Sequence, residues 1–277
     1  MKDDKRNILR SIWFNIIAIL GLVVTITPFL WMIFTSVKSP EEIFVFPPKI
    51  LPKKFYFYNY IRLFKEIEFF RHFKNTFVVT ASSVVLNLFL SSLAAFAFAK
   101  YEFKGKKTIF TLLLSTMMIP GQMTMIPIFL LLKNLGLLNT YLALILTSAV
   151  SVYGIFLIRQ FMLSIPDELI EAARVDGCPE FLIFIKIVLP LCKPILSTLG
   201  IFVFMGTWND FLWPLIVMIK KEMYTLTVAL ANLNSQYATD YGLLMAASTI
   251  VVLPVLIVFF IGQKFIIRSI MISGLKE

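Results

Sequence analysis

Charged and turn-forming residues gather in one polar segment that begins at Ser164. Ser164 is expected to be the N-cap of a short helix, with Asp167 three residues further on in a position like that of a capping box. Gly177 suits the left-handed residue that ends a helix, and Pro179 prevents its continuation. A second helix is expected from about Pro179 to Val188. The chemistry of such a segment is that of a docking surface rather than that of a catalyst.

The first of these helices carries a surface that another protein could approach closely. Ala172 and Ala173 are expected to leave a shallow patch of small side chains. Glu171 and Arg174 are three residues apart and can pair on the helix. The helix–glycine–helix pattern alone fits a solvent-exposed loop without a partner equally well, so both interpretations stay open at this point.

Residues for covalent or metal chemistry are scarce. His72 is the single histidine, and Cys178 and Cys192 form no CxxC pair. One histidine without companion ligands does not make a zinc site. The segment 105–108 approaches a phosphate-binding loop but lacks its first glycine and its closing Ser or Thr. We therefore expect no metal, no bound cofactor and no catalytic residue in this chain.

The composition predicts an all-α protein of the membrane. Hydrophobic residues make up 59% and charged residues 15% of the sequence, against roughly 45–50% and about 25% in soluble domains. A stretch of about 20 apolar residues is needed to cross the hydrocarbon core of a bilayer. Six such transmembrane helices are expected, at about 12–35, 76–99, 108–132, 141–158, 194–219 and 243–261. The first is too long for a signal-peptide core and is expected to stay uncleaved.

The charge pattern gives an orientation. The net charge of +10 is expected to flank membrane spans and contact lipid rather than nucleic acid, because basic loops tend to face the cytoplasm. The loop 99–107 has four lysines and one glutamate. An even number of spans places both termini on one side, and this loop favours the cytoplasm for both.

Two polar features interrupt the apolar spans. Pro120 and Gly121 predict a kink that could be a hinge or only a bend. Asp210 is the single carboxylate in the six expected spans, and a buried charge there is costly unless it faces protein or water. Its neighbours along the chain are Trp208, Asn209 and Trp213. These four residues could line a path for a sugar ring or could join spans through hydrogen bonds.

The polar loop resembles a known signature. Glu171-Ala172-Ala173, then Gly177 after three residues, Ile187 after nine more, and Leu189-Pro190 after one match the loop of ABC importer permeases. Segments 117–120, 136–141 and 208–214 are similar to the sugar-importer branch, and the maltose-type permease with six spans is the most similar. The resemblance covers nearly the whole chain.

The resemblance implies a type I ABC importer transmembrane fold in a bacterial or archaeal plasma membrane, with both termini cytoplasmic. Its domains would be 1–69 (tail, first span and extracytoplasmic loop), 70–263 (type-1 core) and 264–277 (cytoplasmic tail). Within the core, a coupling loop at 164–190 would dock on an ATPase subunit. The implied coupling residues are Glu171, Ala172, Ala173, Asp176, Gly177, Leu189 and Pro190.

The resemblance also implies partners and a function. They are a second permease subunit, two cytoplasmic ATPase subunits that bind ATP and Mg, and an extracytoplasmic solute-binding protein. The chain itself would be a non-catalytic permease that carries a sugar or oligosaccharide inward. The alternatives are an ABC permease for a peptide, a polyamine or a phosphate ester, and an ion-coupled secondary carrier.

Overall fold

The structure is a computed structural model of the chain. It describes the backbone of residues 2–66, 68–236 and 240–274, and the side chains of residues 11–65, 68–233 and 240–264. The described residues form helices and connecting turns, with no strand among them. The contacts divide the chain into two compact units, residues 1–69 with 230–253 and residues 70–229 with 254–277. The expected tail continues as helix to Gly274, and its last three residues lie outside the described part.

The first unit holds long apolar helices joined by a hydrogen-bonded loop. Its elements are α1 (Lys2–Ser36), α2 (Pro40–Ile43), α3 (Tyr58–Glu66), most of α14 (Leu226–Gln236) and the first part of α15 (Tyr241–Gly274). The Asn59 amide donates to the carbonyl oxygens of Ser36 at 2.9 Å and Lys38 at 3.1 Å, so it satisfies the end of α1. Arg62 pairs with Asp240 at 2.5 Å and ties α3 to the start of α15.

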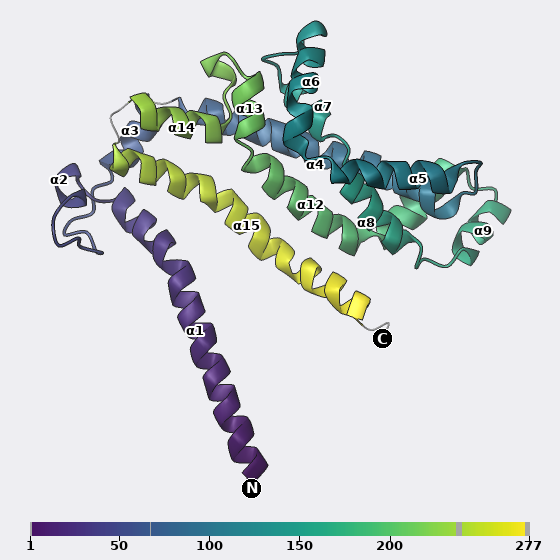
Figure 1. The fold of residues 1–277 in the computed structure, drawn as a ribbon, viewed down its shortest axis with the longest axis horizontal. Coiled ribbons are helices and arrows are strands. Elements are labelled where there is room, and N and C mark those ends of the chain that lie inside the picture. The colour runs from purple at the N-terminus through teal and green to yellow at the C-terminus, as the bar shows by residue number, and fades with distance from the viewer. Residues whose placement is uncertain (1, 67, 237–239, 275–277) are drawn as a thin grey trace. The chain divides into compact units, whose positions relative to one another are not determined.

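The second unit carries the features with functional interest. Its elements are α4 (Phe69–Lys100), α5 (Lys106–Ser115), η1 (Thr116–Met118), α6 (Gly121–Asn134), α7 (Tyr141–Ser148), α8 (Val152–Met162), α9 (Glu168–Val175), α10 (Glu180–Ile183), the π-helix η2 (Phe184–Val188), α11 (Leu189–Leu191), α12 (Lys193–Trp208), α13 (Leu212–Val217) and η3 (Lys221–Met223). In Figure 1, α9 stands at the end of this unit where α4 also ends.

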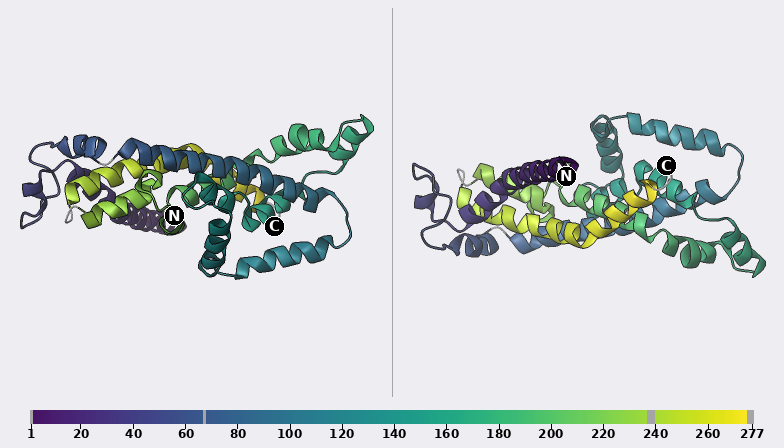
Figure 2. Two further views of the ribbon diagram at one scale, coloured as in Figure 1. Left: turned by 90° about the horizontal axis from the view of Figure 1, so that it is seen from above. Right: turned by 90° about the horizontal axis from the view of Figure 1, so that it is seen from below.

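Among the described residues, the candidate membrane spans are three continuous helices and three bent pairs. Ser11–Ser36, Phe69–Lys100 and Tyr241–Lys264 are each long and apolar enough to cross a bilayer. The bent pairs are 106–118 with 121–134 at 102°, 141–148 with 152–162 at 40°, and 180–191 with 193–208 at 81°. Counting each pair as one span gives up to six, the number that the sequence predicts, although the third pair begins at Glu180 within the 164–190 loop rather than at about residue 194. Both views in Figure 2 show the sharp turn between α5 and α6.

The fifth expected span differs from its prediction. The sequence predicts one helix over about 194–219, but α12 ends at Trp208 and α13 begins at Leu212. The expected kink at Pro120 and Gly121 is confirmed as a complete break. Pro120 has no amide hydrogen to continue the ladder, and α6 starts afresh at Gly121.

Polar side chains of α4 satisfy the break between α7 and α8. The Asn87 amide donates to the Ser148 carbonyl at 2.8 Å, and the Ser83 and Ser148 hydroxyls lie 2.6 Å apart. The Ser151 amide donates to the Ser91 hydroxyl at 3.4 Å. A free backbone group in lipid is costly, so this ladder of α4 side chains lets a span bend inside the membrane.

Substituting Asn87 by Leu keeps the size of the side chain and removes the donor to Ser148. We expect the free energy of unfolding to fall by about 1–3 kcal/mol, because the buried carbonyl loses its partner. Thermal unfolding of the purified protein in detergent measures the loss. Val85→Leu is the control, since Val85 lies on an exposed side of the same helix. Equal unfolding temperatures for the two variants would contradict the assignment.

Candidate functional site

The start of α9, the first helix of the 164–190 loop, differs from its prediction. The N-cap is Asp167, without a hydrogen bond from its side chain to the helix, and not Ser164. The Ser164 hydroxyl donates to the Phe161 carbonyl at 2.7 Å, and its amide also bonds to that carbonyl. Ser164 therefore closes the last turn of α8. A serine serves either role with local bonds alone, which is why its sequence position did not decide between them.

The end of α9 confirms the expected glycine. Gly177 has φ of +76°, a conformation that favours glycine. The Gly177 amide donates to Arg174 and the Cys178 amide donates to Ala173, each at 3.0 Å. These two bonds make a Schellman motif, which turns the chain sharply out of the helix. Open space surrounds Gly177, so its backbone conformation and not crowding requires a glycine.

The two alanines of the signature lie on different faces of α9. Ala172 and Glu171 are exposed, whereas Ala173 is buried beside Ile170 in the apolar core of the second unit. The expectation that both alanines form one exposed patch is therefore wrong. Consecutive helical residues point about 100° apart, so one alanine can offer a small outward surface while the other lets α9 approach the core.

The expected pair between Glu171 and Arg174 is replaced by one across the turn. The Arg174 guanidinium donates to Glu180 through Nε at 2.6 Å and through Nη2 at 3.3 Å. The Tyr101 hydroxyl donates to the same carboxylate. Hydrogen bonds from Arg174 and then Tyr101 lower the pKa of the Glu180 carboxyl. The turn at Gly177 brings Glu180 back to Arg174. The bidentate hydrogen bond that results is stronger than a single ion pair along the helix with Glu171.

The second helix of the loop runs further than expected. α10 passes into the π-helix 184–188 and then α11, which ends at Leu191 rather than at about Val188. Pro190 cannot donate to the helical ladder, and the wider π-helical turn before it accommodates that missing bond. Leu189 is half-buried against the core, and Pro190 is exposed. The remaining predicted coupling residue, Asp176, is the exposed C-cap of α9.

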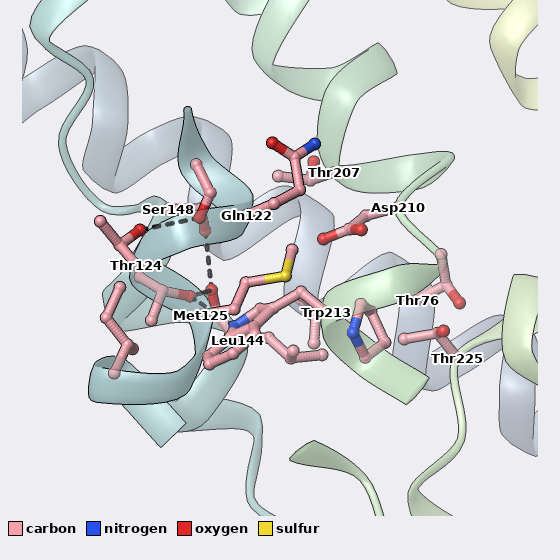
Figure 3. Close-up of a pocket in the computed structure, with 15 residues that line it drawn as sticks. Thr76, Gln122, Thr124, Met125, Leu144, Ser148, Thr207, Asp210, Trp213 and Thr225 are labelled. Carbon is pink, nitrogen blue, oxygen red and sulfur yellow. Dashed lines mark hydrogen bonds between the residues drawn. The ribbon is translucent and has the colours of Figure 1, made fainter. Parts of the chain in front are cut away.

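A cavity of about 310 Å³ lies among several helices of the same unit (Figure 3). Its polar lining residues come from different elements. They include Thr76, Gln122, Thr147, Ser148, Thr207 and Asp210. The size falls in the range of small-molecule sites, which combine apolar walls with a few placed polar groups.

Two of the four predicted path residues line this cavity. Asp210 lies in the break between α12 and α13, and Trp213 donates from Nε1 to the Thr147 hydroxyl at 3.0 Å. Trp208 is buried elsewhere and stacks on Phe204 with ring centroids 5.4 Å apart. The exposed Asn209 donates its amide to the last turn of α12. The pair that faces the cavity is therefore Asp210 and Trp213.

The expected hinge also reaches the cavity. Gly121 and Gln122 line it from the first turn of α6, directly after Pro120. Sequence reasoning did not single out Thr76 or Thr207. The signal available was that each is a polar residue in an otherwise apolar span.

Comparison with known proteins places these features in a family. A family model described as a binding-protein-dependent transport system inner membrane component matches residues 87–272, more than half of the chain. A permease of the arabinooligosaccharides transport system of Bacillus subtilis is 41% identical over 81% of this chain and 80% of its own length. A diacetylchitobiose uptake permease of Streptomyces coelicolor is 34% identical over 91% of this chain and 84% of its own length.

The fold has a solved counterpart. A bacterial ABC transporter involved in the import of the polysaccharide alginate contains a chain that aligns with a TM-score of 0.84 and 24% identity, over 95% of this chain and 97% of that chain. The predicted all-α fold and the resemblance to ABC importer permeases are both confirmed. The chain belongs to the family of inner membrane components of binding-protein-dependent transport systems.

Proposed function

We propose that the chain is the permease subunit of an ABC importer that moves a short oligosaccharide inward. The observation that carries the proposal is the exposed helix α9, held at its end by the Schellman turn at Gly177. The relatives named above are permeases for arabinooligosaccharides and for diacetylchitobiose. Both compounds are short chains of sugar units, which supports this substrate class.

The outward face of α9 would dock on a separate ATPase subunit. Val175 is 88% exposed and lies beside exposed Ala172, with the carboxylates of Glu168, Glu171 and Asp176 around them. A large apolar side chain within a polar rim is typical of a contact site. A basic rim around an apolar groove on the ATPase would complement it. ATP and Mg would bind to that partner, and this chain would hold no cofactor.

Two further partners are proposed, a second permease subunit and a solute-binding protein. A cavity lined on this chain by Asp210 and Trp213 would form one wall of the path, and a second permease subunit would supply the other. The family is defined by dependence on a binding protein, so a solute-binding protein would deliver the sugar on the outer side. Both termini and α9 would face the cytoplasm of the cell, with the lysine-rich 99–107 loop beside them.

The cavity has groups suited to a sugar. An aromatic ring can pack against the apolar face of a pyranose, a carboxylate can accept hydrogen bonds from its hydroxyls, and an amide can both accept and donate. Figure 3 shows the Asp210 carboxylate and the Gln122 amide facing the same space. The break at Pro120 and Gly121 would act as the hinge that lets Gln122 move with α6 as the path opens and closes.

Uptake by the assembled importer tests the proposal. We expect liposomes that contain this chain, its partner permease and the ATPase to accumulate a labelled oligosaccharide only with ATP and the loaded binding protein. Peptide, polyamine and phosphate-ester cargoes serve as competitors. Uptake by this chain alone, driven by an ion gradient and without ATP, would show a secondary carrier instead.

Gly177→Val tests the docking role of α9. A β-branched residue is strained at a φ of +76°, by about 1–2 kcal/mol. Because the turn should shift to relieve this strain, we expect uptake to fall roughly tenfold. ATP hydrolysis should continue, but the loaded binding protein should no longer stimulate it. The measurement is uptake and hydrolysis in the same liposomes.

Gly136→Val is a matched control. Gly136 has φ of +68° and open space around it, and its turn has the same pair of hydrogen bonds at the end of α6. The strain is the same, but the turn lies outside the 164–190 loop. We expect Gly136→Val to lower stability without separating hydrolysis from uptake; equal uncoupling in both variants would argue against a docking role.

A further inference from the structure

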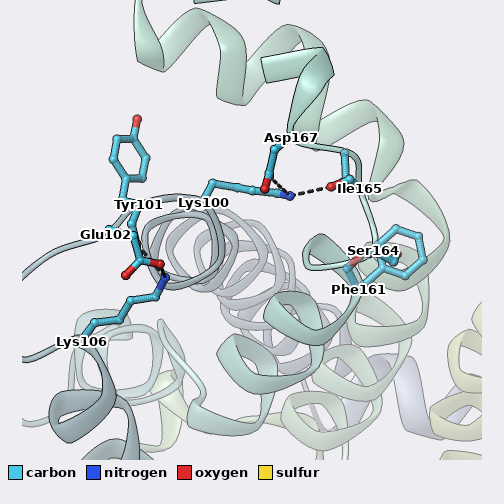
Figure 4. A network of polar contacts seen from close by, with 8 residues as sticks. All are labelled: Lys100, Tyr101, Glu102, Lys106, Phe161, Ser164, Ile165 and Asp167. Atoms are coloured by element: carbon cyan, nitrogen blue, oxygen red, sulfur yellow. Dashed lines mark hydrogen bonds and ion pairs between the residues drawn. The ribbon is translucent and has the colours of Figure 1, made fainter. Parts of the chain in front are cut away.

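Two consecutive residues at the end of α4 hold both ends of the coupling helix. The Lys100 ammonium donates to the Ile165 carbonyl and to Asp167 Oδ1, each at 2.6 Å (Figure 4). The Lys100 side chain is only 3% exposed. A buried ammonium depends on its protein partners, because water does not replace them. Lys100 thus fixes the chain where α9 begins.

The next residue fixes the other end. The Tyr101 hydroxyl donates to Glu180, which also accepts from Arg174. The Arg174 guanidinium lies over the Tyr101 ring, 5.7 Å from its centroid. Arg174 is in the last turn of α9 and Glu180 begins α10, so Tyr101 touches both sides of the turn at Gly177.

The protonation states favour a permanent attachment. The hydrogen bond from Lys100 lowers the pKa of the Asp167 carboxyl, and burial raises the pKa of the Tyr101 hydroxyl. Asp167 therefore stays ionised, and its bond is lost only as the pH falls through its lowered pKa. Tyr101 stays a protonated donor until the pH rises above its ordinary value. Both contacts persist at neutral pH.

The connecting segments on either side of α9 do not by themselves fix its orientation. Residues 163–167 before α9 and 176–179 after it form turns rather than regular helix. Such turns allow a short helix to tilt or rotate. Two contacts at opposite ends of an eight-residue helix restrict both movements, because either one would break a contact with Lys100 or Tyr101.

α4 leads from this attachment to the cavity. It is one helix of 32 residues without Pro or Gly, from Phe69 to Lys100. Thr76 and Val79 of α4 line the cavity. The rise of about 1.5 Å per residue puts Thr76 about 36 Å along the helix from Lys100. The Thr76 hydroxyl also accepts from the Leu226 amide at 2.7 Å, so the far end of α4 is fixed as well.

We propose that Lys100 and Tyr101 are positioning residues that join α9 to α4 as one body throughout the transport cycle. A displacement of α9 by the ATPase is then delivered along α4 to Thr76 and Val79 at the cavity. The inference rests on the proposed docking of an ATPase at α9. It adds the route by which that docking reaches the substrate path.

Lys100→Met in the assembled importer tests the attachment at the start of α9. We expect uptake per ATP hydrolysed to fall roughly fivefold to tenfold, the size of a typical coupling energy. Lys100→Arg keeps the positive charge and should retain much of the wild-type uptake per ATP hydrolysed. Lys104→Met is the matched control, because it removes the charge of an exposed lysine in the short loop that follows α4. A wild-type ratio in Lys100→Met overturns the proposal.

A cross-link tests whether the attachment lasts through the cycle. Tyr101→Cys and Glu180→Cys are made in a chain where Cys178 and Cys192 are replaced, and are bridged with a short bis-maleimide. We expect the unbridged variant to lose uptake per ATP and the bridged one to regain it. Loss of uptake on bridging would show that the two sites must separate, and would overturn the proposal.

These outcomes are separable from those of the proposed function. Wild-type liposomes without ATP-dependent uptake would count against the importer itself. Wild-type uptake with an unchanged Lys100→Met ratio, or with a bridged variant that is blocked, counts only against the attachment. Co-purification of the ATPase with each variant establishes assembly. If Lys100→Met does not assemble, the bridged variant alone decides.

Discussion

Hydrocarbon offers no hydrogen bonds, and this constraint explains where the chain places its polar groups. Spans break at Pro120, at 149–151 and at 209–211. The lining residues Gln122, Ser148 and Asp210 each lie within two residues of one of these breaks. A cavity lined with polar groups thus forms where helices stop, because the freed backbone and the polar side chains need the same sheltered space.

α4 supports one of these breaks directly, the one at 149–151. Its middle supplies Asn87 to the break between α7 and α8, and Thr76 near its start accepts from Leu226. Its end supplies Lys100 and Tyr101 to the polar loop. An unbroken helix can support broken ones because all of its own backbone bonds are internal. A single rigid element therefore contacts both the cavity and the loop.

Local chemistry made part of this structure predictable from sequence. Span count follows from hydropathy, and Gly177 and Pro120 act through their own backbones, so their effects needed no knowledge of the fold. The partner of Arg174 did not follow, since Glu171 and Glu180 are both near in sequence and only the turn geometry selects Glu180. The break at 209–211 was also missed, because no proline or glycine lies within it and the polar pair Asn209 and Asp210 is flanked by apolar residues on both sides.

The 164–190 loop was easier to predict than the cavity for the same reason, since the loop depends on local sequence and the cavity on the fold. α9 is specified by contiguous residues, with Ala173 inward, Ala172 outward and Gly177 at its end. The cavity takes its lining residues from α4, α6, α7, α12, α13 and two connecting segments. Replacing one lining residue changes what the cavity can bind without altering the turn chemistry of the loop. The sequence therefore predicts the turn residues of the loop more readily than the residues that line the cavity.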